Sequence, residues 1–181
     1  MRTIAALFLV LASCSANPST DLVERADKLF VQTFMGSCAI EIGNHDRVRA
    51  AAKAMKWKLI TDPNARKMLS PADGNQKWAG WLIQQDKRGF MLALTEGEID
   101  NLSVLTCTLV GDVSDVDATK RRIVQLLAAD RQANDEANGQ RTEVWNFKSE
   151  RGRQALSFID AQAMGMKTLN AGIVMNKADF K

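Results

Sequence analysis

The stretch LSVLTCTLV at residues 102–110 decides the fold class of this chain. In it, Leu105, Cys107 and Leu109 alternate with threonines. Successive side chains of a β-strand point to opposite faces, so this alternation predicts a strand that turns Cys107 and the two leucines toward a core. A strand with one apolar face is typical of an antiparallel sheet that is covered on one side.

Segments with strand or helix patterns continue on both sides of this stretch. Alternating or short apolar runs predict further strands at residues 77–84, 90–95, 142–147, 154–161 and 167–175. Apolar residues at helical spacing predict helices at residues 21–35, 44–55 and 115–129, with one helical turn at 66–69. We expect the first helix to be capped by Asp21 with Glu24 as its partner. The polar stretch 130–139 is expected to be a loop.

This order predicts an α+β fold, a mostly antiparallel sheet with helices on one face. Behind one extra amino-terminal helix, the order α-β-β-β occurs twice. Cys38 and Cys107 are 69 residues apart, as are Asp46 and Asp115, which points to a tandem duplication. A pseudo-twofold axis would then bring the two related cysteines together. The repeats would span 38–106 and 107–175. Chance similarity between two helix-then-hairpin segments is the alternative.

The amino-terminal residues have the pattern of an export signal. Arg2 precedes an apolar run at residues 4–12, which is too short to cross a bilayer as a helix. Residues 11–14, Leu-Ala-Ser-Cys, resemble the bacterial lipobox, in which the signal is cut just before a cysteine that then carries lipid. The resemblance implies lipidation of Cys14 and anchoring to a membrane. The residue after it is Ser15 rather than Asp, which resembles bacterial lipoproteins that are sorted to the outer membrane.

The domain boundaries follow from this signal. The signal would occupy residues 1–13, a tether 14–20, and a single domain 21–181, which is long enough to bury a substantial core. Cleavage after Ala16 is the alternative, with a signal at 1–16 and a soluble periplasmic or secreted protein. A cytosolic protein with a buried amino-terminal helix is a further alternative.

Cysteine usage points to a disulfide. If Cys14 belongs to the signal or carries lipid, Cys38 and Cys107 remain as an even pair in an oxidising compartment. We therefore predict a bond between them. Closing a loop of about 70 residues would stabilise the fold by roughly 4 kcal/mol. Two separate buried thiols are the alternative.

Charge and motifs exclude several classes of function. The formal net charge is +3, which implies no particular partner. The basic clusters at 120–122 and 151–153 are not interleaved with aromatic residues, so we expect no nucleic-acid partner. There is no phosphate-binding loop, no dinucleotide glycine motif and no cysteine-pair zinc motif. We expect no cofactor.

Candidate catalytic groups are few. His45 is the one histidine, and with Glu41 and Asp46 it would form a weak metal or acid–base group, although a helix-entry loop accounts for the same residues. Glu96 and Glu98 form a carboxylate pair in an expected turn. The strand and helix order distantly resembles the glyoxalase and dioxygenase superfamily, but this chain lacks that family's several histidine and glutamate ligands. We therefore assign no catalytic residue and no metal ligand.

The tryptophans are the remaining candidates for a binding surface. Trp78 and Trp81 are three residues apart on one predicted strand, so they point to opposite faces. An exposed tryptophan would stack on a sugar or anchor a partner protein, and core packing is the alternative. Trp57 and Trp145 are expected in the core.

Lys56-Trp57 after an alanine-rich helix, followed by tryptophan-bearing strands and a late cysteine strand, resembles small exported proteins of Gram-negative bacteria whose function is uncharacterised. No catalytic residue carries over from that resemblance. We expect an envelope binding module, lipid-anchored or periplasmic, that recognises a protein or a glycan; an inhibitor or a toxin-immunity protein falls within this class. A small periplasmic hydrolase that uses His45 or a carboxylate pair is the alternative.

Overall fold

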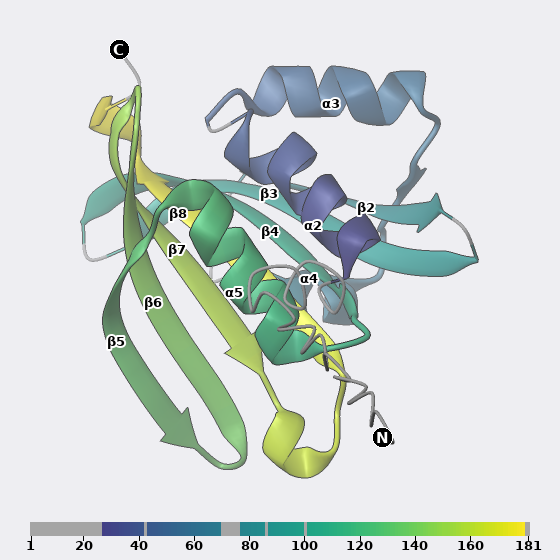
Figure 1. Cartoon of the computed structure of the whole chain (residues 1–181). Coiled ribbons are helices and arrows are strands. Elements are labelled where there is room, and N and C mark those ends of the chain that lie inside the picture. Colours follow the sequence, from purple (N-terminus) through teal and green to yellow (C-terminus); the bar gives the residue numbers. More distant parts are fainter. Residues whose placement is uncertain (1–26, 42, 70–76, 86, 100, 180–181) are drawn as a thin grey trace, which may run out of the picture.

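One antiparallel sheet organises the chain, as predicted (Figure 1). The structure, a computed structural model, describes residues 27–41, 43–69, 77–85, 87–99 and 101–179. Within these residues the sheet has eight strands in the order β1-β2-β3-β4-β8-β7-β6-β5. Together with the helices that pack against it, the sheet makes an α+β fold.

The bounds of the elements agree closely with most of the predicted segments. The strands are β1 Lys58–Leu59, β2 Lys77–Gln85, β3 Arg88–Ile99, β4 Leu102–Asp112, β5 Asp130–Ala137, β6 Gln140–Ser149, β7 Gly152–Asp160 and β8 Thr168–Asn176. The α-helices are α2 Lys28–Phe34, α3 His45–Ala54, α4 Pro63–Leu69 and α5 Val116–Leu127. A π-helix, η1 Met35–Ala39, continues α2, and the short 3-10 helices η2 Gln162–Met164 and η3 Lys177–Asp179 flank β8.

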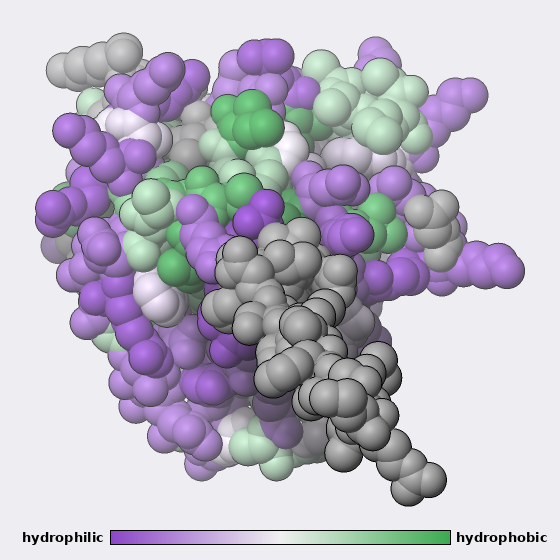
Figure 2. Space-filling view, viewed as in Figure 1, coloured by the Kyte–Doolittle hydropathy of each residue, from purple (hydrophilic) through white to green (hydrophobic). Residues whose placement is uncertain are grey.

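The expectation of a loop at 130–139 is wrong, because residues 130–137 form β5. All eight of its side chains are exposed, so the strand has no apolar alternation to reveal it. Strand β5 is held in place by backbone hydrogen bonds to β6 at the edge of the sheet. In Figure 2 the surface over β5 and β6, at the lower left, is largely hydrophilic, whereas apolar side chains gather toward the top, over α2 and α3.

The first described helix begins later than predicted. Asp27 is the N-cap of α2, and its carboxylate accepts a hydrogen bond of 3.0 Å from the Phe30 N–H. The predicted capping pair, Asp21 and Glu24, lies outside the described residues. Asp27 is almost fully buried, and two further contacts compensate its charge there: an ion pair of 2.7 Å with Arg88 of β3 and a hydrogen bond of 3.2 Å from the Ser114 N–H.

The strand registers of the two halves repeat with a constant shift. Leu94 of β3 pairs with Cys107 of β4, and 64 residues later Phe158 of β7 pairs with Ala171 of β8. The same shift relates the β2–β3 and β6–β7 registers, and the strand order is symmetric about the central β4–β8 pair. The predicted shift was 69 residues, and Cys38 lies in η1 rather than on a strand. The two cysteines therefore do not occupy equivalent positions.

The core lies between the sheet and the helices α2, α3 and α5. Its largest fully buried side chains include Phe30, Phe34, Leu92, Leu109, Ile123 and Phe158. Figure 1 shows α2 and α5 lying across the side of the sheet that faces the viewer. Helix α4 differs from the expected one-sided arrangement. Its Arg66 guanidinium lies 5.8 Å from the ring of Trp78, which alternates with core residues of β2 and so points to the other face.

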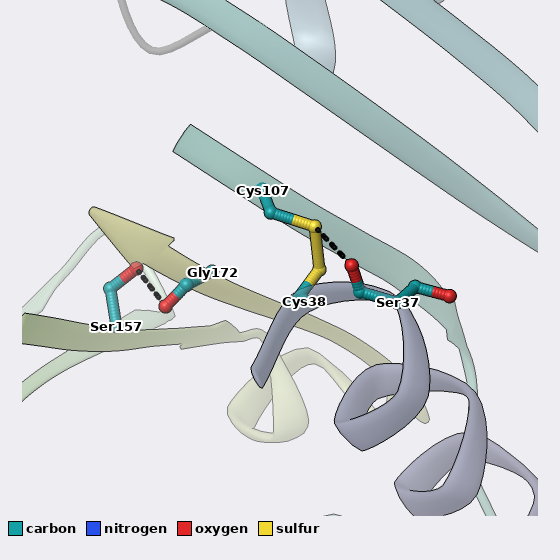
Figure 3. Close-up of a disulfide and its surroundings, with 5 residues drawn as sticks. All are labelled: Ser37, Cys38, Cys107, Ser157 and Gly172. Atoms are coloured by element: carbon teal, nitrogen blue, oxygen red, sulfur yellow. Dashed lines mark hydrogen bonds between the residues drawn. A yellow bond between two sulfur atoms is a disulfide. The ribbon is translucent and has the colours of Figure 1, made fainter. Parts of the chain in front are cut away.

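Cys38 and Cys107 form the predicted disulfide (Figure 3). The bond joins η1 to β4, with the two Cα atoms 5.4 Å apart. Both side chains are buried, and Cys107 faces the core as its alternation with threonines predicted. In the π-helical turn, the Ile40 N–H donates a hydrogen bond of 2.8 Å to the Met35 carbonyl. The bond thus fixes the end of the α2–η1 segment to the centre of the sheet.

Removal of this disulfide should destabilise the protein strongly. Replacing both Cys38 and Cys107 by Ser frees a loop with a sequence separation of 69 in the unfolded chain, which should lower the free energy of unfolding by about 4 kcal/mol. Guanidinium denaturation of wild type and of the double variant measures the difference. Wild type treated with reductant should match the variant. A double variant as stable as oxidised wild type would contradict this role.

Candidate functional site

A groove lies between α2, η1, α3 and the end of β2, and we name it the α2–α3 groove. Its volume is about 560 Å³. Its apolar walls are formed by six residues: Leu29, Val48, Ala51, Met55, Trp57 and Ile83. Pockets of this size with mostly apolar walls are typical of ligand-binding sites.

The groove exists because α3 touches the core at few points. The helix starts at Asn44, whose side chain accepts the Arg47 N–H at 3.3 Å. Of its residues only Val48 and Ala52 are buried. After α3 the chain turns at Lys56, whose φ is +54°, and runs directly into β1. A helix held by two small contacts leaves open space between itself and α2.

Gly36 of η1 widens the groove. It lines the hollow, and a Cβ atom added to it would meet no atom within 4 Å. A Cβ atom at this position would therefore meet open space. π-helical turns are frequent at functional sites, because the extra residue changes the direction of neighbouring side chains.

Polar groups line the rim of the α2–α3 groove. Arg47 of α3 forms an ion pair of 3.3 Å with Glu41. The Arg47 side chain is 70% exposed, so much of its guanidinium remains open to solvent. Gln32, Gln84 and Gln85 also line the groove. Apolar walls with a few polar groups at the edge suit an apolar ligand whose orientation is fixed by hydrogen bonds.

His45 does not line this groove. It is the first residue of α3, and its pKa is lowered to about 4 by burial and by the nearby Arg49, while Glu96 and Asp46 act in the opposite direction. Its imidazole is therefore neutral at pH 7. Glu41, the other expected partner, pairs with Arg47 instead. In the part of the chain that the structure describes, no three His, Cys, Asp or Glu side chains gather to hold a metal ion.

The carboxylate pair Glu96 and Glu98 lies in strand β3, where a turn was expected. Glu96 pairs with Lys77 at 3.5 Å and accepts a hydrogen bond from Lys177, which lowers its pKa. Glu98 is exposed. Cleavage of a glycosidic bond requires one carboxylic acid with a raised pKa and a second ionised carboxylate. The ion-paired Glu96 is poorly suited to the acid role.

A second hollow, of about 320 Å³, lies over charged residues beside α5. The Lys120 ammonium is buried 2.8 Å from Asp160, and Arg141 bonds Asp117 at 2.7 Å. Burial raises the pKa of both aspartates, but hydrogen bonds from Lys120 to Asp160 and from Gln162 and Arg141 to Asp117 outweigh it, so both pKa values are lowered. These carboxylates are held ionised by their partners and are poor general acids.

The predicted binding tryptophans lie in two different environments. Trp81 faces the core and is 8% exposed. Trp78 lies on the opposite face, with its ring so close over Gly80 that an added Cβ would come within 2.4 Å of it. Trp57, expected in the core, packs against it but also forms a wall of the groove. No pattern in the sequence marked Trp57 as a groove residue, because its position depends on β1, a strand of only two residues.

The predicted lipidation site, Cys14, lies outside the described residues. Among the helices that the structure describes, none combines the length and apolar content needed to cross a membrane. Comparison with protein-family models, with curated proteins and with solved structures finds no match to this chain. The geometry of the α2–α3 groove is therefore the main basis for a functional argument.

His45 should make the fold sensitive to acid. Its pKa is about 4 in the folded protein and about 6.5 in the unfolded chain, so between these values the unfolded state binds a proton that the folded state does not. The free energy of unfolding should fall as the pH drops through this window. His45→Gln should reduce that fall, as measured by chemical denaturation at a series of pH values. Parallel pH profiles for the two proteins would contradict the assignment.

Proposed function

We propose that this protein is a binding module of the bacterial cell envelope and that the α2–α3 groove holds an apolar group of its ligand. The observation that carries the proposal is the groove itself, about 560 Å³ in volume with apolar walls. Its size lies within the range of roughly 300–1,000 Å³ that is typical of ligand pockets. A partner protein with a protruding apolar side chain would bury that side chain against Trp57 and Ile83.

The arrangement of charged groups also favours binding over hydrolysis. Glu96, Asp117 and Asp160 all have lowered pKa values and are engaged in ion pairs. His45 is neutral near pH 7 and lies outside the residues that line the groove. The hydrolase alternative therefore has no groove in which a base and an acid converge, among the residues that the structure describes.

We also propose that the protein is exported and tethered through Cys14 to the periplasmic side of the outer membrane. This rests on the lipobox-like residues 11–14 and on the apolar run before them. A disulfide between Cys38 and Cys107 is expected in an oxidising compartment, and so supports export. An inhibitor or immunity protein would act in this position by capturing its partner.

The symmetry of the sheet supports a tandem duplication. Lys77 of β2 pairs with Glu96 of β3, and 64 residues later Arg141 of β6 pairs with Asp160 of β7. A cation and a carboxylate thus recur at equivalent positions of the two halves. We propose that the two halves arose by duplication with this shift, and that the first half kept an open groove.

Filling the groove should abolish binding of an apolar probe. Gly36 lines the groove, so Gly36→Phe adds a large ring at its wall, whereas Gly36→Ala adds only a Cβ that meets no atom within 4 Å. Titration with the fluorescent dye N-phenyl-1-naphthylamine should show a Kd raised about tenfold or more by Phe and changed less than about twofold by Ala. Circular dichroism checks that both variants fold. Undiminished dye binding by the Gly36→Phe variant would exclude the groove as the site.

The lipid anchor has a direct test. The mature protein from membranes should begin at Cys14 and carry acyl chains on that residue, as seen by mass spectrometry of its amino-terminal peptide. Cys14→Ser removes the thiol that would carry the lipid, so no acylated amino-terminal peptide should be recovered from that variant. An unmodified chain that begins at Asn17 would disprove lipidation and leave export intact.

A further inference from the structure

The outer edge of β2 is open where it meets the α2–α3 groove. Strand β1 is two residues long and pairs only with Trp81 and Leu82 of β2. The following residues, 83–85, pair with β3 on one side. On their other side, no strand within the described part of the chain pairs with them.

The backbone of Gln84 points toward this open edge. The Ile60 N–H donates to the Gly80 carbonyl at 2.8 Å, which shows that the backbone groups of Gly80 face the β1 side. The N–H and C=O groups of successive residues point to opposite edges of a strand, so those of Leu82 and Gln84 point to the same edge as those of Gly80. Gln84 is exposed and lines the groove. Its N–H and C=O therefore form a short strand-pairing edge next to the groove.

The edge and the apolar walls lie within one hollow. Ile83 precedes Gln84 and lines the groove together with Leu29 and Val48. In a strand added beside Gln84, every second side chain would point to the face on which Ile83 lies. One apolar side chain of that strand would enter the groove while its backbone bonds to β2. This is the geometry by which sheet edges capture extended peptides.

Charges around the groove favour an acidic partner. Three exposed cations lie at or beside it: Arg47 lines the groove, Lys56 stands between the groove residues Met55 and Trp57, and Lys87 lines a neighbouring hollow together with Gln84 and Gln85. The described acidic residues on α3 and at the groove rim are Asp46 and Glu41, and Glu41 is already paired with Arg47. An extended segment with carboxylates on either side of an apolar residue would complement this surface.

We propose that the ligand is an extended segment of another protein, with an apolar residue flanked by acidic residues, that adds as a strand to β2 at Gln84. This rests on the proposed function, because the apolar residue occupies the α2–α3 groove. Backbone pairing supplies affinity, the groove selects the apolar side chain, and the cations select its flanks. An acyl chain or a glycan would use the groove without using the edge.

Synthetic heptapeptides test the proposal. The probes are acetylated and amidated Asp-Glu-X-Leu-X-Glu-Asp, with X as Val, Ile, Phe or Trp, measured by calorimetry against the mature protein with its disulfide intact. At least one peptide should bind, and its counterpart with Lys in place of every acidic residue should bind about tenfold more weakly or worse. Failure of every acidic peptide to bind, or equal binding of the basic counterparts, would overturn the proposal.

Backbone pairing is tested from both sides of the interface. In the best peptide, N-methylation of one of two adjacent central residues should abolish binding and N-methylation of the other should not, since alternate N–H groups face β2. Gln84→Pro removes an N–H that is not used by β3 and should raise the peptide Kd about tenfold or more, whereas Gln84→Ala should leave it within about twofold. Indifference to both N-methylations would overturn strand addition.

The outcomes separate this inference from the proposed function. If the Gly36→Phe variant loses the naphthyl dye and no acidic peptide binds to wild type, the groove remains the binding site and the peptide ligand is wrong. If dye binding survives the Gly36→Phe substitution, the groove itself is not the site.

Discussion

The bond between Cys38 and Cys107 fixes the helical segment on which the rest of the site is built. It holds the end of η1 against the central strand β4. At the start of the same segment, buried Asp27 accepts hydrogen bonds from Phe30 and Ser114 and pairs with Arg88 of β3. A segment held at both ends does not need every intervening residue to pack. Gly36 can therefore leave open surface at low cost in stability.

The two halves of the sheet differ in how their edges are closed. In the second half, β5 covers the edge of β6 along most of its length, and α5 buries Lys120 against Asp160 and Glu143. In the first half, β1 pairs with two residues of β2, and α3 buries only Val48 and Ala52. The groove and the free edge thus lie together where the closing elements are short. An element with few buried contacts is also the least costly to displace when a ligand enters.

Most of the fold follows from patterns in the sequence, and the site does not. Alternation predicted β4 and β8 because each turns apolar residues toward a buried side. The disulfide was predicted from the two cysteines that remain once Cys14 is assigned to the signal or the lipid. Strand β5 was missed because all its side chains are exposed, and no pattern records backbone pairing. The groove depends on where α3 leaves the core and on the length of β1. Both are set by packing between segments that are distant in the sequence. No sequence pattern therefore indicated that Trp57 and Gln84 line a groove.

Methyl-resolved NMR would locate a bound apolar molecule most directly. In titrations with N-phenyl-1-naphthylamine, we predict that the largest chemical-shift changes fall on the methyl groups of Leu29, Val48 and Ile83, which line the groove. Changes centred instead on Val144 and Ile159, on the opposite face of the sheet with Trp78, would contradict it and move the binding surface to that face.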